Sequence, residues 1–445
     1  MSLGQAVEAR TPLTHARVLR IAIPIVLANA TVPILGAVDT GVIGQLGEAA
    51  PIGAVGIGAV ILATFYWVFG FLRMGTTGLT ANAAGAGDTP EVAALLTRAL
   101  MIGLGAGLVI IVAQVPLFWI AFRASPASAE VEALARSYMG IRIFSAPAAI
   151  ALYGLTGWLI AQERTGAVLA VQLAMNGVNI GLDLLFVLQL EWGVEGVALA
   201  TLISEWAGLG LGFWLCRGAF AVPAWRDWAR VFDRTRLTRM ALVNRDILLR
   251  SLMLQGIVVS FMFLGSNFGD VQLAANQVLM QFLLFTAFAL DGFAFAAEAL
   301  VGQSMGRGER DSLRRSVVLS GGWGLVICVV MSLAFWIFGG MIIDLMTSAP
   351  DVRIGARRFL PWIIAAPVFG VWAWMLDGVF IGATRAGDMR NMMAISLVVY
   401  VASVAVLVPA FGNHGLWASY LISFVARGVT LGLRYPALEA QVRAG

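Results

Sequence analysis

Lysine is absent from this chain of 445 residues, and histidine and cysteine occur only twice each. Cys216 and Cys328 lie in or at the ends of apolar runs, so they predict neither a disulfide framework nor a metal site. His15 and His414 are too few for a metal centre or a histidine-based proton relay. We therefore expect no metal and no cofactor.

Charge is also scarce. Only 12% of the residues are charged and 60% are hydrophobic, whereas soluble domains are about a quarter charged. The sequence therefore predicts an all-α polytopic membrane protein. The first 20 residues carry several charges and no apolar core with a cleavage site, so we expect the first span to be retained. There is no phosphate-binding loop and no nucleophile–base pair, which argues against an enzyme.

Apolar runs of about 20 residues predict twelve transmembrane helices. Their approximate limits are 20–46, 52–81, 95–122, 138–161, 167–190, 195–217, 246–268, 272–302, 315–340, 358–383, 390–411 and 414–434. One long connection, 217–250, holds eight arginines against three aspartates. It predicts an amino-terminal lobe (1–217), a cytoplasmic linker (218–245) and a carboxy-terminal lobe (246–445). We interpret the basic linker as a cytoplasmic loop and not as a nucleic-acid site.

Arginine counts predict the orientation. With the amino terminus inside, the inside segments hold 22 arginines and the outside segments 6, while Arg73 lies within a span. Positive residues concentrate on the cytoplasmic side. We therefore expect a multi-pass protein of the bacterial inner membrane with both termini in the cytoplasm.

The two halves repeat. GWLIAQERTG (157–166) matches GVFIGATRAG (378–387) at an offset of 221 residues, and GVALATLIS (196–204) matches GLWASYLIS (415–423) at 219. Six spans in each half give parallel-topology repeats, and transporters built from such repeats place their site at the repeat interface.

Polar residues collect at similar depth in the first half. They lie near the midplane or in the outer half of the spans, and they are Asp39, Asn179, Asp183, Thr201 and Glu205. A carboxylate in hydrocarbon is costly, and desolvation favours its protonated form, so such a group can carry a proton or hold a cation. The alternative is structural: polar side chains also join helices by hydrogen bonds. For Glu205 both interpretations stay open.

The second half places its acids nearer the cytoplasm. Asp291, Glu298 and Asp377 lie at a depth similar to that of Arg73. We expect Arg73 to pair with one of them in a buried ion pair that acts as a gate or as a structural tie.

The oxygen atoms of the polar cluster suggest which ion could drive transport. Asp39, Asn179, Asp183 and Thr201 could together hold sodium, but a proton needs only one desolvated carboxylate. We expect Asp39 to carry a proton with Asp183 as its partner, with sodium as the alternative at the same residues.

Five segments resemble the multidrug and toxic compound extrusion (MATE) family, in its DinF-like branch. They are PILGAVDTGVIGQLG (33–47), FLRMGTTGLTANAAGAG (71–87), IRIFSAPA (141–148), LDGFAFAAEALVGQ (290–303) and LDGVFIGATRA (376–386). The resemblance implies twelve helices in two six-helix lobes around a central cleft. It also implies antiport, the export of cationic and amphipathic compounds in exchange for protons or sodium. Asp39, Asn179, Asp183 and Thr201 match the family's cation site, and Asp377 matches an acidic position on the tenth helix.

One departure concerns the seventh helix, where the NorM-like branch has a glutamate. Here the segment reads SLMLQGIVV, with Leu254 and Gln255, which puts coupling through the second lobe in doubt. A lipid-linked saccharide flippase of the related superfamily is an alternative, but it predicts a more cationic cavity. A non-transporting membrane scaffold would not need carboxylates at membrane depth. The expected partners are small-molecule substrates and membrane lipids, with the protein acting as a monomer.

Overall fold

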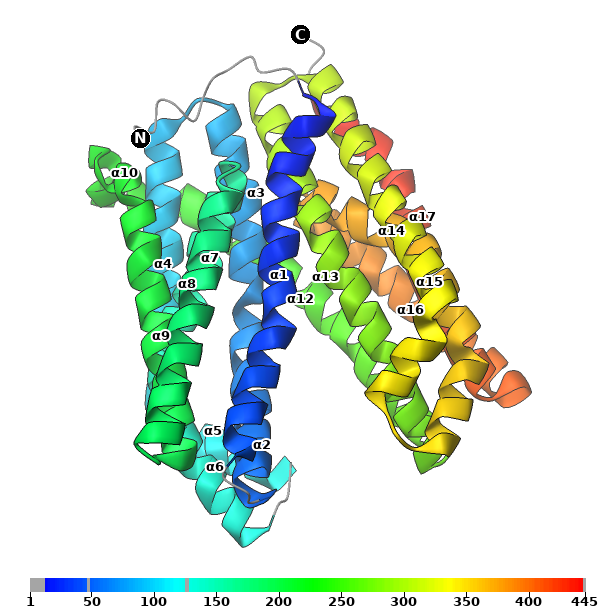
Figure 1. Cartoon of the computed structure of the whole chain (residues 1–445). Helices are drawn as coiled ribbons and strands as arrows, with labels where there is room; N and C mark the ends of the chain where they lie inside the picture. Colours follow the sequence, from blue (N-terminus) through cyan, green and yellow to red (C-terminus); the bar gives the residue numbers. More distant parts are fainter. Residues whose placement is uncertain (1–12, 46–48, 125–127, 443–445) are drawn as a thin grey trace. The chain divides into compact units, whose positions relative to one another are not determined.

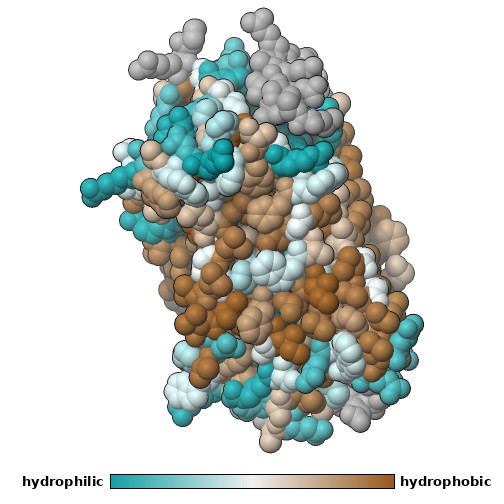
Figure 2. Space-filling model, turned by 90° about the vertical axis from the view of Figure 1, so that its left-hand side faces the viewer, coloured by the Kyte–Doolittle hydropathy of each residue, from teal (hydrophilic) through white to brown (hydrophobic). Residues whose placement is uncertain are grey.

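The computed structural model describes residues 13–45, 49–124 and 128–442. Within these ranges the chain forms helices and no strands, and twelve helical segments are long and apolar enough to cross a membrane. The twelve predicted spans are therefore confirmed. Figure 2 shows one face of the molecule, on which hydrophobic residues form a band between two hydrophilic ends.

The first half contains six spans, and three of them are interrupted helices. The continuous ones are α1 (His15–Gly44), α4 (Thr89–Val112) and α9 (Gly193–Leu215). The interrupted ones are α2 (Ala49–Trp67) with η2 (Val68–Gly70) and α3 (Phe71–Gly85), α6 (Ala129–Arg142) with η3 (Ile143–Ser145) and α7 (Ala146–Ala161), and α8 (Thr165–Asp183) with the π-helical η4 (Leu184–Gln189).

The six spans of the second half are single helices. They are α12 (Arg234–Ser266), α13 (Asp270–Arg307), α14 (Arg310–Met346), α15 (Pro350–Gly382), α16 (Ala386–Phe411) and α17 (Asn413–Glu439). Cys216 and Cys328 are buried and their thiols are free.

The apolar run at 95–122 is not one helix. α4 ends at Val112, and a separate α5 (Gln114–Ala124) follows. Pro116 explains the break, because it has no backbone N–H and its ring would clash with the carbonyl four residues earlier. The expectation of one helix to residue 122 was wrong.

The described chain divides into two compact units. The first comprises Leu27–Ala84 and Asp88–Leu237, and the second comprises 13–26, Gly85–Gly87 and 238–442. The division passes through α1, so this helix contributes residues to both units. Its proline residues, Pro24 and Pro33, lie within the continuous helix.

Helix packing repeats between the units. In the first unit α4 packs on α7, α8 on α9 and α2 on α6 (Figure 1). In the second unit the equivalent spans make the same pairs, α14 with α15, α16 with α17 and α13 with α15. The sequence repeat is thus a repeat of helix packing.

In each half, a glycine allows two helix backbones to pack closely at the equivalent position. A Cβ atom on Gly157 would lie 2.3 Å from the carbonyl oxygen of Arg73, and one on Gly378 would lie 2.7 Å from that of Ala294. These two contacts are related by the same offset of 221 residues. The turns that follow also match, because Glu163 and Thr384 both adopt positive φ, 58° and 55°. Only glycine lets helix backbones come this close.

The segment between the lobes is ordered and docked. It forms α10 (Arg217–Phe220), η5 (Pro223–Arg226) and α11 (Trp228–Val231), and α12 begins at Arg234, before the apolar run at 246. Arg98 of α4 donates to the carbonyls of Val231 at 2.8 Å and Arg230 at 2.6 Å. Glu91 binds Arg98 at 2.6 Å and also pairs with Arg236. The segment therefore packs on the end of α4.

We predict that Gly157→Ala and Gly378→Ala each destabilise the protein by about 1–3 kcal/mol, because the new methyl group forces two helix backbones apart. Gly177→Ala is the matched control, since a Cβ there meets no atom within 4 Å. Thermal unfolding of the purified protein measures the effect. Equal melting temperatures for all three variants would contradict this account of the repeat.

Candidate functional site

Four of the predicted site residues lie together in the first unit. Asp39 comes from α1, Asn179 and Asp183 lie one helical turn apart on α8, and Thr201 lies on α9. Oriented to satisfy both of its ends, the Asn179 amide donates to Asp39 Oδ1 at 3.1 Å and to Asp183 Oδ2 at 3.2 Å. Its oxygen then faces the Thr201 hydroxyl at 3.2 Å. One amide therefore bridges two carboxyl groups and a third helix.

The two carboxyl groups are close neighbours, because each lies within 3.2 Å of the same Asn179 nitrogen. Asp183 is fully buried, and its Oδ1 atom receives no hydrogen bond from the part of the chain that the structure describes. Because two adjacent carboxylates repel each other, the pair is chemically suited to hold one proton or another small cation.

A polar row on α8 extends this cluster, and the sequence reasoning missed it. Gln172 donates to the Asn176 side-chain oxygen at 3.0 Å, and the Asn176 amide donates to the Thr31 hydroxyl of α1 at 2.7 Å. Residues 172, 176, 179 and 183 are spaced by three or four, which places them on one face of the helix. That spacing was the signal that could have found Gln172 and Asn176.

The helix changes form directly after Asp183. η4 is π-helical over Leu184–Gln189, and the Leu190 amide donates to the Leu185 carbonyl at 3.0 Å. Single-turn π segments often occur at functional sites. The wider turn gives α8 a local irregularity next to its buried carboxyl group.

Glu205 has a cationic partner on α6. Arg142 Nη1 lies 2.9 Å from Glu205 Oε2 and donates to the Ser145 hydroxyl at 2.6 Å. Arg142 had been assigned to an outside loop, but it is the last residue of α6, inside the span Ala129–Ala161. Arg142 lies near the start of the predicted run 138–161 and was nevertheless counted among the six outside arginines. This ion pair joins α6 to α9, which favours the structural interpretation of Glu205.

Asp377 is bound by arginines of its own unit. It pairs with Arg250 of α12, and Arg427 of α17 lies 3.8 Å from the same carboxylate oxygen. All three side chains are buried. Sequence reasoning had placed Arg250 in the loop and Arg427 among the cytoplasmic charges, so it left Arg73 as the only basic residue inside a span. That was wrong, because Arg142, Arg250 and Arg427 also lie inside spans.

The remaining secondary candidates lie on α3 and α13. Glu298 is buried on α13, whereas Arg73 and Asp291 are half-buried. The backbone of α15 packs closely on α13 at this point, because a Cβ atom on Gly382 would lie 2.4 Å from the Glu298 carbonyl oxygen. The pairing of Arg73 with Asp291 or Glu298 stays a prediction.

Comparison with known proteins supports the internal repeat. The MatE family model matches the chain twice, at residues 24–185 and 247–408. DNA damage-inducible protein F of Escherichia coli (strain K12) is 38% identical over 424 residues, which cover 92% of this chain and 90% of that protein. A probable multidrug resistance protein NorM of Pseudomonas syringae pv. tomato is 24% identical over 431 residues, covering 94% and 91%.

Solved structures share the fold. A crystal structure of MATE in the straight conformation aligns with a TM-score of 0.87 at 18% identity and covers 99% of this chain and 100% of that chain. The Vibrio cholerae MATE transporter VcmN in the bent form aligns with a TM-score of 0.83 at 20% identity, covering 96% and 97%.

We predict that Asp377→Asn destabilises the protein by about 3–5 kcal/mol, because two buried arginines lose their carboxylate. Adding Arg250→Met should restore part of the loss, since one stranded cation is then removed. Asp344→Asn is the control: its partner Arg357 lies at 2.6 Å, but the pair is exposed. Thermal unfolding reports all three, and a stable Asp377→Asn variant would refute the buried pairing.

Proposed function

Because this chain belongs to the MATE family of multidrug and toxin efflux transporters, in its DinF-like branch, we propose that it is a proton-driven antiporter. It exports cationic and amphipathic organic compounds and imports protons. Asp39 carries the proton, Asp183 is its partner, and Asn179 and Thr201 hold the pair in place. The protein lies in the bacterial inner membrane with both termini in the cytoplasm, as the arginine bias favours, and it works as a monomer.

The support for the proton is the hydrogen bonding of the Asn179 side chain. When its amide is oriented so that both of its ends are bonded, the nitrogen faces the two carboxyl groups, at 3.1 and 3.2 Å. Sodium prefers oxygen ligands, so an ion between the carboxylates would be repelled by the positive edge of the amide unless the amide turned. A proton on one carboxyl group satisfies the bridge without any rearrangement.

The antiport cycle follows from charge. With both carboxyl groups ionised, the buried site is negative and attracts a cationic substrate or a proton. One proton halves the negative charge of the site and weakens that attraction, so proton and substrate compete. Such competition is the requirement for exchange, because each ligand must displace the other.

α1 links the site to the rest of the molecule. Its residues to Val26 belong to the second unit and its residues from Leu27 to the first. Within the second unit, Gly292 of α13 packs closely on α1, where a Cβ would lie 2.5 Å from the Ala22 carbonyl oxygen. In the first unit, Thr31 and Asp39 bond to α8. Protonation of Asp39 relaxes α1 and closes the substrate site in the first unit, and ionisation reopens it.

The test uses reconstituted vesicles loaded with a fluorescent cationic dye. An inward proton gradient in sodium-free buffer should drive dye efflux, and Asp39→Asn should abolish it. Glu132→Gln, at an exposed helix ion pair with Arg136, is the control and should keep full activity.

Sodium at the same residues predicts another result. If a sodium gradient at clamped pH drives efflux and a proton gradient does not, the proton assignment is wrong. If neither gradient drives efflux of any cationic dye that the protein binds, antiport itself is wrong.

A further inference from the structure

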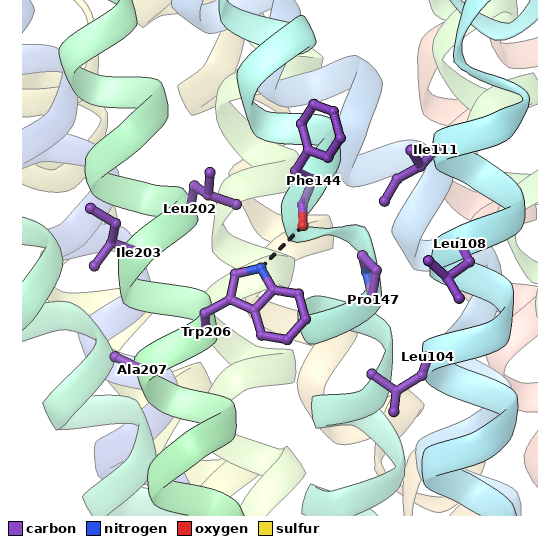
Figure 3. A pocket seen from close by; sticks show the side chains of 9 residues that line it. All are labelled: Leu104, Leu108, Ile111, Phe144, Pro147, Leu202, Ile203, Trp206 and Ala207. Carbon is purple, nitrogen blue, oxygen red and sulfur yellow. Dashed lines mark hydrogen bonds between the residues drawn. The ribbon is translucent and has the colours of Figure 1, made fainter.

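An apolar groove crosses the surface of the first unit between α4, α7 and α9 (Figure 3). Its volume is about 810 Å³. α4 contributes one wall, α9 the other, and the η3–α7 junction lies between them. The lining residues are Leu104, Leu108, Ile111, Phe144, Pro147, Leu202, Ile203, Trp206 and Ala207.

The sequence of α4 builds this shape. Gly103 and Gly107 bring α4 against α7, where their Cβ atoms would lie 2.6 Å from Ala151 Cα and 2.2 Å from Pro147 Cα. The next residues along α4, Leu104 and Leu108, then project beside the contact. The close α4–α7 backbone contact forms the bottom of the groove, and the side chains of Leu104 and Leu108 form one of its sides.

Trp206 fixes the other side. Its indole N–H donates to the Phe144 carbonyl at 3.1 Å (Figure 3). Pro147 lies three residues further on and has no N–H, so it cannot donate to this carbonyl as the 3-10 pattern of η3 would require. The indole therefore closes a gap in helix bonding and holds its ring along the groove.

The groove is open to the surroundings of the spans. Leu108 is 59% exposed, Phe144 50% and Trp206 44%. All three lie in membrane-spanning segments, where exposed side chains face hydrocarbon. Every lining side chain is apolar apart from the indole N–H, and that group already has its partner.

We propose that this groove is a binding site for one acyl chain of a membrane phospholipid. An apolar groove of this size, within the range of about 300–1,000 Å³ for small-molecule pockets, lies where the only abundant ligand is a hydrocarbon chain. It occupies the last turns of α4 and the start of α7, so its lipid belongs to the leaflet at which α4 ends.

The lining residues directly follow the polar residues of α6 and α9 in the chain. Leu202 follows Thr201, Trp206 follows Glu205, and Phe144 is two residues from Arg142. A bound chain therefore packs against the turns of α9 that carry Thr201 and Glu205, and against η3, which directly follows Arg142.

Fluorescence quenching tests the site. The full chain is purified in detergent and given a few phospholipids per protein that carry bromine on one acyl chain, since bromine quenches tryptophan on contact. The Trp206 signal is the difference between the wild type and Trp206→Phe. The comparison is Trp336 of α14, 69% exposed and outside the groove, obtained in the same way with Trp336→Phe.

The groove site predicts that limiting brominated lipid lowers the Trp206 emission by about half or more, because one chain contacts the indole directly, while the Trp336 emission is nearly unchanged. Ala207→Phe fills the groove and should abolish the Trp206 quenching. Ala402→Phe, on an exposed position of α16, should leave it intact.

Native mass spectrometry gives a second readout that does not depend on tryptophan. The wild type and Ala402→Phe should each retain one phospholipid, and Ala207→Phe should retain none. Equal quenching of Trp206 and Trp336, or lipid retention by Ala207→Phe equal to that of the wild type, would overturn the proposal.

Discussion

Hydrocarbon offers no hydrogen-bond partners, so every charged group inside the spans must find its partner within the protein. The described spans meet this constraint in three ways. Arg142 and Glu205 form a simple pair, Asp377 is held between Arg250 and Arg427, and Asp39 and Asp183 share the amide of Asn179. Of these three arrangements, the last has no arginine bonded to its carboxyl groups, and we propose that the coupling proton binds there.

The two units therefore share a fold and differ in charge. Their helices pair in the same order, and the glycine contacts at Gly157 and Gly378 recur at one offset. The polar site does not recur. The first unit has two acids and an amide, Asp39, Asp183 and Asn179, whereas the second has one acid, Asp377, with two arginines. Because Asp377 is already paired with Arg250, we propose that the coupling ion binds in the first unit.

The sequence predicted features that depend on local pattern. Hydropathy located twelve spans, because a span must be apolar for about 20 residues, and family motifs with helical spacing grouped Asp39 with Asn179 and Asp183. It missed Arg142, Arg250 and Arg427 as ion-pair partners inside the spans, because charged residues near a span's end were counted as loop. Their partners lie 50 to 127 residues away in the chain, and pairs so far apart produce no local sequence pattern. The groove was equally invisible, since it depends on how α4, α7 and α9 approach one another.

Proton release on substrate binding tests the central claim most directly. Purified protein in weakly buffered, sodium-free solution is mixed with a cationic dye, and a pH indicator follows the released protons. The account predicts release of about one proton per bound dye, because the pair holds a single shared proton, and none from Asp39→Asn. Dye binding by the wild type with no proton released would contradict it.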